Sequence, residues 1–154
     1  MTPMMIKGTI LALGLLVPAA VSAQTCPNPT ATLDQAVAKT QAAVKSNDAT
    51  AFLTLVGSQG LMLGSEGPQA SKAQLSADFK AKKGAYCELF TCAGKVGRLK
   101  KLLSVPNPAK RLNTARNGNV FGIVTLSRGH ATDEVELSYA LVSCKWELTA
   151  IGTL

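Results

Sequence analysis

The chain has 154 residues, a formal net charge of +7 and only 5% aromatic residues. This length is enough for one domain with a sizeable core, and too short for two once a leader is removed. The scarcity of aromatic side chains and the lack of a recognition-helix or RNA-binding motif argue against nucleic acid as the partner of this basic chain.

The first 23 residues have the pattern of a secretory signal peptide. An almost wholly apolar run over residues 8–21 follows Lys7, and Val21-Ser22-Ala23 forms an A-x-A-like cleavage site. The run is too short to span a bilayer comfortably, although an uncleaved membrane anchor is the alternative. We therefore expect an exported protein, periplasmic or secreted, whose mature chain begins at Gln24.

All four cysteines would remain in the mature chain: Cys26, Cys87, Cys92 and Cys144. An even number in an exported chain favours disulfides. A metal site is not expected, because His130 is the only histidine and no C-x-x-C pair exists. In one continuous strand Cys87 and Cys92 would point to opposite faces, so they can pair only if Phe90-Thr91 turns. Of the three possible pairings we favour Cys92–Cys144 with Cys26–Cys87, because Cys92 and Cys144 both flank strand ends.

A Pro-rich lead-in, residues 24–32, precedes two predicted helices. Thr32 and Gln35 form a capping box that predicts a first helix beginning after Thr32, with apolar residues at helical spacing. Ser46-Asn47-Asp48 ends this helix and caps a second one over residues 49–56. A short apolar strand bounded by Gly60 and Gly64 follows.

A second capping box, Ser71 with Gln74, predicts a third helix over residues 72–83. Residues 85–90 are predicted to form a strand. Residues 95–103 suggest a short amphipathic helix with its basic side chains outside, and Pro106-Asn107-Pro108 ends it.

The segment from Asn119 to Ile151 predicts three consecutive antiparallel strands, because apolar residues alternate with a period of two. The pattern stops at a turn over residues 128–133 and again at Ser143-Cys144-Lys145. On the last strand Trp146 and Leu148 share a face, and Ile151 is placed on the opposite one. Trp146 is expected to be a largely buried anchor that faces the helices.

The order of the elements indicates an α+β fold. Helices come first and antiparallel strands come last, which is unlike the regular alternation of an α/β protein. We expect one domain over residues 33–154, with N-terminal helices packed on a curved antiparallel sheet and a C-terminal three-strand meander.

This arrangement resembles the cone-shaped nuclear-transport-factor-2-like superfamily. The resemblance rests on two N-terminal helices, a glycine-bounded strand, a capped helix and a meander ending in Lys145-Trp146-x-Leu148-x-x-Ile151. It implies a pocket inside the cone. Members of the superfamily include ketosteroid-isomerase-like and cyclase-like enzymes as well as non-catalytic binding modules.

The enzymes of this superfamily need an acidic or histidine base and a tyrosine or aspartate oxyanion donor inside the cone, and no matching set is found in this chain. No catalytic residue or cofactor is therefore expected. His130 reads as a solvated turn histidine. The candidate pocket-lining residues are Tyr86, Phe121, Tyr139 and Trp146. Alternation along the strands places Phe121 and Tyr139 on one concave face only if the sheet curves there, and otherwise separates them.

A long stretch between Glu88 and Asp133 contains basic residues and no acidic one. Its candidate anion-binding residues are Arg98, Lys100, Lys101, Lys110 and Arg111. Such a block gives a one-sided positive field that attracts anions, and the alternative is a solvated face that only aids solubility. A membrane-lying helix over 95–103 is disfavoured, because it is short and lacks aromatic anchors.

We therefore expect an exported non-catalytic module that binds a small molecule or an anionic partner of the cell envelope, an anionic polymer among them, with peripheral contact to the envelope. A small pocket enzyme of the ketosteroid-isomerase or cyclase type is the alternative.

Overall fold

The computed structural model describes residues 26–64, 67, 69–129 and 134–153. The expected leader, its cleavage site after Ala23 and the turn histidine His130 lie outside the described residues. In chain order the elements are α1 (Pro29–Ser46), α2 (Ala49–Leu55), β1 (Leu61–Leu63), β2 (Gln69–Ala70), α3 (Lys72–Ala81), α4 (Ala85–Leu89), β3 (Thr91–Cys92), β4 (Lys95–Val96), α5 (Arg98–Leu103), β5 (Ala109–Thr114), β6 (Val120–Ser127), β7 (Glu134–Val142) and β8 (Lys145–Thr153).

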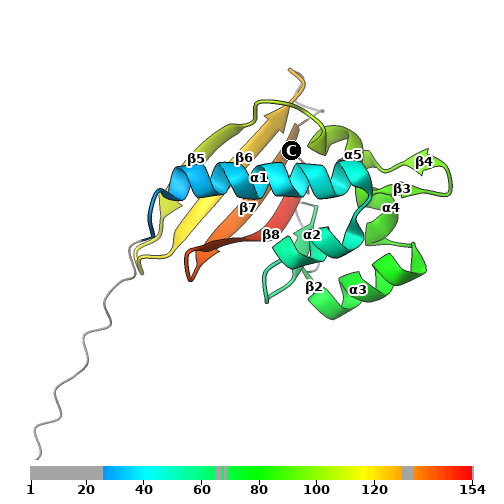
Figure 1. Cartoon of the computed structure of the whole chain (residues 1–154), viewed down its shortest axis with the longest axis horizontal. Coiled ribbons are helices and arrows are strands. Elements are labelled where there is room, and N and C mark those ends of the chain that lie inside the picture. The colour runs from blue at the N-terminus through cyan, green and yellow to red at the C-terminus, as the bar shows by residue number, and fades with distance from the viewer. Residues whose placement is uncertain (1–25, 65–66, 68, 130–133, 154) are drawn as a thin grey trace, which may run out of the picture.

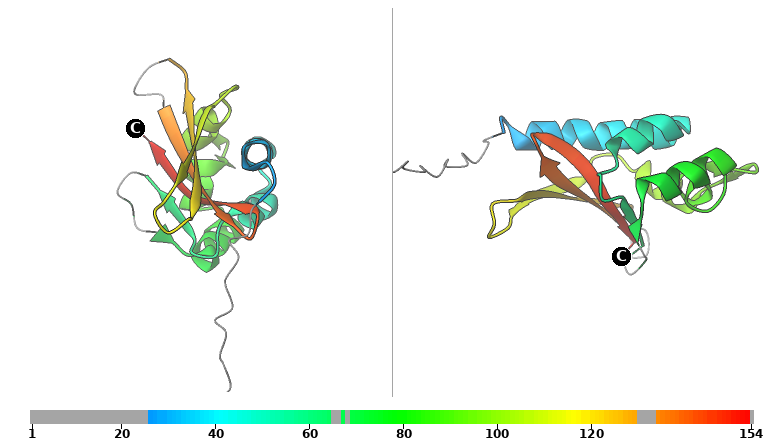
Figure 2. Two further views of the ribbon diagram at one scale, coloured as in Figure 1. Left: turned by 90° about the vertical axis from the view of Figure 1, so that its left-hand side faces the viewer. Right: turned by 90° about the horizontal axis from the view of Figure 1, so that it is seen from below.

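The fold has two layers, as Figures 1 and 2 show. Helix α1 lies across one face of a twisted six-stranded sheet with the order β2-β1-β8-β7-β6-β5. Helices α2 to α5 and the small β3–β4 hairpin gather at one end of α1. The α+β class and the terminal meander are confirmed. The sheet is mixed, because β1 runs parallel to β8 while the other strand pairs are antiparallel.

Helix α1 begins four residues earlier than the capping-box prediction, which is wrong at this point. Asn28 is the N-cap, and its side chain accepts a hydrogen bond from the Ala31 amide. Pro29 occupies the first turn, where its missing N–H costs nothing. The Thr32 hydroxyl instead donates to the Pro29 carbonyl inside the helix. The last residues of the lead-in are therefore helical.

The capping predictions for α2 and α3 are confirmed. The Asp48 carboxylate accepts from the Ala51 amide, and both halves of the Ser71–Gln74 capping box are formed. Helix α3 ends at Ala81, and Lys82 follows in the left-handed conformation. These caps satisfy amides that would otherwise be left without a partner at the helix starts.

Residues 85–89 form a helix, so the strand predicted over residues 85–90 is wrong. Helix α4 covers Ala85–Leu89, and its Tyr86 ring packs 4.9 Å from the Phe90 ring. Both rings join Phe52 and Phe79 in one buried aromatic cluster. A spacing of four residues keeps two side chains on the same side in a strand and in a helix alike, and so this short run could not distinguish them.

The helix predicted over residues 95–103 begins only at Arg98, and α5 covers Arg98–Leu103. Lys95 and Val96 form strand β4, and Val96 is 47% exposed at the projecting hairpin. Helix α5 then buries Leu99, Leu102 and Leu103. The hairpin uses Ala93 and Gly94, both at positive φ, as its turn.

Strand β8 contains a bulge, and after the bulge the alternation of its side chains between the two faces of the sheet is shifted by one residue. Ser138 pairs with Ala150 and Tyr139 with Leu148, which leaves Thr149 as the extra residue. Trp146 and Leu148 face the helices, as expected. After the bulge Ile151 is fully buried, so its predicted placement on the opposite face is wrong.

The disulfides are Cys26–Cys144 and Cys87–Cys92, so the favoured pairing is wrong. Cys87 and Cys92 meet because α4 ends at Leu89 and the chain turns at Phe90 into β3. Cys26 lies just before α1, and Cys144 lies in the two-residue turn between β7 and β8. Their Cα atoms are 5.2 Å apart. The Cys26–Cys144 disulfide therefore fastens the start of α1 to the meander.

The space between α1 and the sheet is filled by side chains. Leu33, Val37 and Val44 of α1 are buried against Val124, Leu126, Leu137 and Leu148 of the strands. Gly122 lets α1 approach closely, because a Cβ built there would lie 2.7 Å from a Leu33 methyl group. Among the described residues, no helix is long and apolar enough to cross a membrane.

Candidate functional site

The four expected pocket residues do not gather in one cavity. Tyr139 is fully buried, and its hydroxyl donates to the Thr40 hydroxyl at 2.9 Å. Thr40 in turn donates to the Ala36 carbonyl within α1. Burial raises the pKa of Tyr139, although the hydrogen bond to Thr40 opposes this effect. This pair ties the helix to the sheet deep in the core.

Phe121 and Tyr86 lie elsewhere. Phe121 is half-buried and sits next to Gly122, which pairs with Tyr139, so Phe121 and Tyr139 are on opposite faces of the sheet. Phe121 and Tyr139 are thus separated, as expected from strand alternation when the sheet does not curve locally. Tyr86 belongs to the aromatic cluster at the end of the helices.

Trp146 holds the start of α1 against the meander. The side chain is 8% exposed, and the indole N–H donates to the Pro29 carbonyl and the Thr32 hydroxyl, at 3.1 and 3.0 Å. Its burial is confirmed. One edge of the residue lines a surface groove beside α1.

The five expected anion-binding residues separate into two places. Arg98, Lys100 and Lys101 are on α5, whereas Lys110 and Arg111 are on β5. The two side chains of β5 face acidic partners, Lys110 with Asp34 at 2.6 Å and Arg111 with Glu136 at 3.9 Å. Because these carboxylates offset their charge, β5 is the weaker candidate for an external anion.

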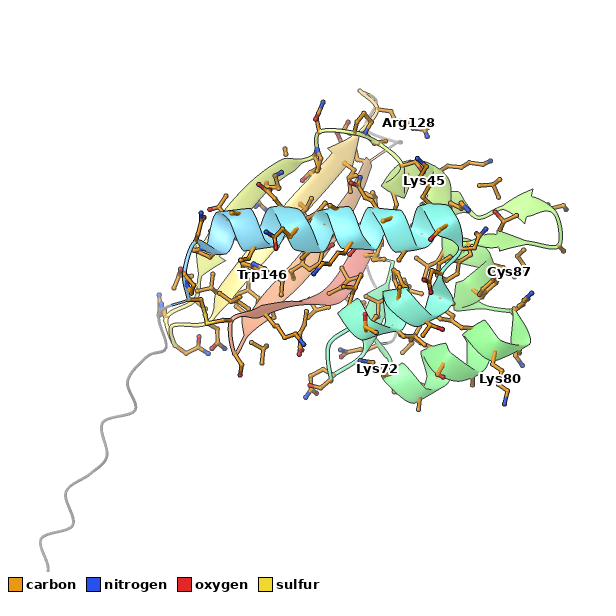
Figure 3. The ribbon with its side chains drawn as sticks, viewed as in Figure 1. Lys45, Lys72, Lys80, Cys87, Arg128 and Trp146 are labelled. Carbon is orange, nitrogen blue, oxygen red and sulfur yellow. A yellow bond between two sulfur atoms is a disulfide. The ribbon has the colours of Figure 1, made fainter. Side chains whose placement is uncertain are left out.

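The α5 residues belong to a larger group of cations at the helical end of the molecule. We call this group the basic end, and its members are Lys80, Lys82, Lys83, Lys95, Arg98, Lys100 and Lys101. Lys80 and Cys87 lie at this end in Figure 3, whereas Trp146 lies by the other half of α1. Helix α3 with the residues after it, the β3–β4 hairpin and helix α5 supply these cations, and helix α4 contacts α3, α5 and β3.

The Cys87–Cys92 disulfide organises the centre of the basic end. Both sulfur atoms lie within 3.5 Å of the Lys82 carbonyl oxygen, so the end of α3 lies close to α4 and β3. Lys95 pairs with Cys92 across the hairpin. Positive charge at the C-terminus of α3 also suits the helix dipole.

Most of the basic end is exposed, and few acidic groups lie close to it. Lys100 is half-buried, and its ammonium group donates hydrogen bonds to the Asn47 amide oxygen at 2.7 Å and the Thr91 hydroxyl at 3.3 Å. Asp78 and Glu88 are the carboxylates on these elements, and Asp78 accepts a hydrogen bond from the Ala85 amide. In the described part of the chain, none of the seven cations forms an ion pair.

This arrangement can attract and hold an extended anion. Its cations spread over helices α3 and α5, the residues just after α3 and the β3–β4 hairpin. In the sequence Lys95 lies in the same acid-free stretch as the candidates Arg98, Lys100 and Lys101, and Lys80, Lys82 and Lys83 lie just upstream of it. The run of positive charge was visible, but the fold was needed to bring the end of α3 beside α5.

No candidate metal centre is found within the described ranges, where no three histidine, cysteine or carboxylate side chains cluster.

Several proteins of known structure resemble this chain. An NTF-2-like protein of unknown function from Shewanella oneidensis is 14% identical, over 80% of this chain and 97% of that chain, with a TM-score of 0.47. An NTF2-like protein from Cytophaga hutchinsonii is 13% identical, over 79% and 93%, with a TM-score of 0.44. The orange carotenoid protein of Anabaena, solved with canthaxanthin bound, is 13% identical, over 95% of this chain and 43% of that chain, with a TM-score of 0.42. No protein-family model and no curated protein matches the sequence. The similarity to NTF2-like proteins concerns the fold alone.

Proposed function

We propose that the protein is an exported, non-catalytic module whose basic end binds an anionic polymer of the cell envelope. The observation that carries this proposal is the gathering of seven cations, unpaired with carboxylates in the described structure, on one exposed end of the fold. Separated charges on an exposed surface suit a ligand with many charges along its length.

A polymer fits this end better than a membrane surface. Val96 is the large apolar side chain that the basic end exposes, and a single valine adds little insertion energy. Helix α5 has six residues and no aromatic anchor of the kind that holds a helix at a lipid interface. Binding is therefore expected to depend on charge.

A binding role is favoured over the isomerase-like or cyclase-like alternative by the interior of the fold. A pocket enzyme needs a base and an oxyanion donor that face substrate. Tyr139 is the strand tyrosine whose side chain faces the helices. It is fully buried, and its hydroxyl donates a hydrogen bond to the Thr40 hydroxyl. The core side chains around it leave that hydroxyl without access to a ligand.

Export is supported by two independent features. The leader-like pattern ends at Ala23, and two disulfides suit an oxidising compartment. Intact-mass measurement of exported material should find a chain that begins at Gln24. Finding Met1 retained would contradict this part of the proposal.

The polymer proposal is tested by the binding of fluorescein-labelled dextran sulfate, followed by anisotropy. The Lys83→Glu/Arg98→Glu variant should bind about tenfold or more weakly, because both exposed cations lie at the basic end. Binding should also weaken steeply as salt is added.

A matched control separates the location of charge from its amount. Arg111→Glu/Arg116→Glu changes the net charge equally at two exposed sites on and just after β5, away from the basic end. This variant should keep most of the affinity. Equal losses in both variants would show that only net charge matters, and salt-independent binding would contradict the electrostatic account.

A further inference from the structure

We propose that a groove between α1, α2 and the β7–β8 turn is a second binding site, which takes a small amphiphilic anion. This site lies apart from the basic end and does not depend on the polymer proposal. It would hold an anionic head beside two lysines and an alkyl tail between the two helices.

The groove has the size and composition of a small-molecule site. Its volume is about 550 Å³, within the range usual for ligand pockets. Three separate segments line it, and the lining residues are Thr32, Gln35, Ala36, Lys39, Thr54, Leu55, Cys144, Lys145 and Trp146. The groove thus joins the helix layer to the last hairpin of the sheet.

The charges of the groove favour an anion. Lys39 and Lys145 are exposed, and in the described part of the chain neither side-chain ammonium group forms an ion pair or hydrogen bond. No carboxylate is among the lining residues. The Gln35 side chain is exposed as well and offers an amide N–H. Two ammonium groups and one amide can therefore face a single anionic head.

The two threonine hydroxyls in the lining are already engaged as donors. Thr32 donates to the Pro29 carbonyl, and Thr54 donates to the Ala51 carbonyl at 2.7 Å. The lysines and Gln35 must therefore supply the hydrogen bonds to the head. This division makes the charge of the two lysines the decisive feature.

A shallower hollow of about 390 Å³ continues from the groove along α1 and α2. The two share Lys39, Thr54 and Leu55, and small apolar side chains line much of the continuation: Ala42, Ala43 and Ala51. From Lys39 to Ser46 the helix rises about 10 Å. This length accommodates a short alkyl tail.

The far end of the hollow disfavours an anionic head, which orients the ligand. Asp48 lies there, with its carboxylate on the Ala51 amide. A negative head placed beside it would be repelled, whereas at Lys39 and Lys145 it is attracted. The head is therefore expected at the Trp146 end and the tail at the Asp48 end.

Trp146 makes the test direct, because it is the single tryptophan of the chain and lines the groove. Its emission should change saturably when octyl phosphate or octanoate is added at monomeric concentrations. Inorganic phosphate, which lacks the tail, and octyltrimethylammonium, which has the opposite charge, should bind much more weakly. The stronger of the two anions identifies the preferred head.

Two variants locate the binding. Lys39→Gln/Lys145→Gln should weaken octyl phosphate about tenfold or more, because two attractive charges are lost. Ala42→Glu should also weaken it, since a like charge then enters the tail hollow. Lys82→Gln/Lys83→Gln, which removes the same charge from the basic end, should leave the affinity unchanged. All five substituted positions are exposed, so circular dichroism should show native structure.

The outcomes that overturn the site are distinct. Equal binding of octyl phosphate by the wild type and by the Lys39→Gln/Lys145→Gln variant would contradict the binding of the anionic head by these two lysines. Equal binding of inorganic phosphate and octyl phosphate would contradict the binding of the alkyl tail in the hollow. No saturable change of Trp146 emission with either amphiphilic anion would overturn the proposal as a whole.

Discussion

The two disulfides should contribute unequally to stability, because they close loops of very different length. Cys26 and Cys144 are 118 residues apart in the sequence, whereas Cys87 and Cys92 are 5 apart. If a disulfide acts mainly by restricting the unfolded chain, the long loop is worth about 5 kcal/mol and the short one about 2 kcal/mol. The expected difference is therefore about 3 kcal/mol.

The assay compares Cys26→Ser/Cys144→Ser with Cys87→Ser/Cys92→Ser by urea unfolding, followed by Trp146 emission. All four cysteines are partly buried, so the local cost of serine is similar in the two variants. The first variant should lose more free energy of unfolding by about 3 kcal/mol. If it fails to fold while the second stays folded, the order is the same. Equal losses, or a larger loss for the short loop, would refute the loop-length argument.

Three further predictions concern the core. Gly122→Ala should lower the free energy of unfolding by about 1–3 kcal/mol, because the new methyl group meets α1, whereas Gly152→Ala, with no atom closer than 4.0 Å, should be nearly neutral in the same urea assay. Tyr139→Phe should cost about 1 kcal/mol at pH 7. Because burial raises the pKa of Tyr139 in the folded state, wild-type stability should be unaffected below the ordinary pKa of 10.0 and fall above it, and this alkaline loss should be smaller in the variant. The native emission of Trp146 should be blue-shifted and should move red on unfolding, and a native spectrum already at the solvent-exposed position would contradict its burial.

The parts of the fold that could be predicted from the sequence are those with a strong local pattern. The meander alternates over long strands with one buried face, and so its period of two is unambiguous. The capping box at Ser71 is a local motif whose geometry depends on a few adjacent residues. Neither needs information from a distant part of the chain.

The parts that could not be predicted depend on contacts between distant segments or lack a pattern. Strand β5 was missed because all six of its residues are exposed, so no alternation marks it. The bulge at Thr149 changes the facing of Ile151 without any signal such as glycine. Asn28-Pro29 did carry a usable signal, a capping residue followed by proline, which competed with the capping box at Thr32.

The disulfides and the two candidate sites show the same limit. Spacing allowed three pairings, and only the position of α1 against the β7–β8 turn selects Cys26 with Cys144. The basic end joins α3 to α5 across the fold. The groove unites Lys39 and Lys145, which are more than a hundred positions apart.

The most direct test of the polymer proposal is to map the contact surface by NMR. Amide chemical shifts of the isotopically labelled mature chain would be followed while short dextran sulfate fragments are added. We predict that the largest shifts lie at the end of α3, in the β3–β4 hairpin and in α5, and that they vanish at high salt. Shifts concentrated on β5, or spread evenly over the sheet, would contradict the assignment of binding to the basic end.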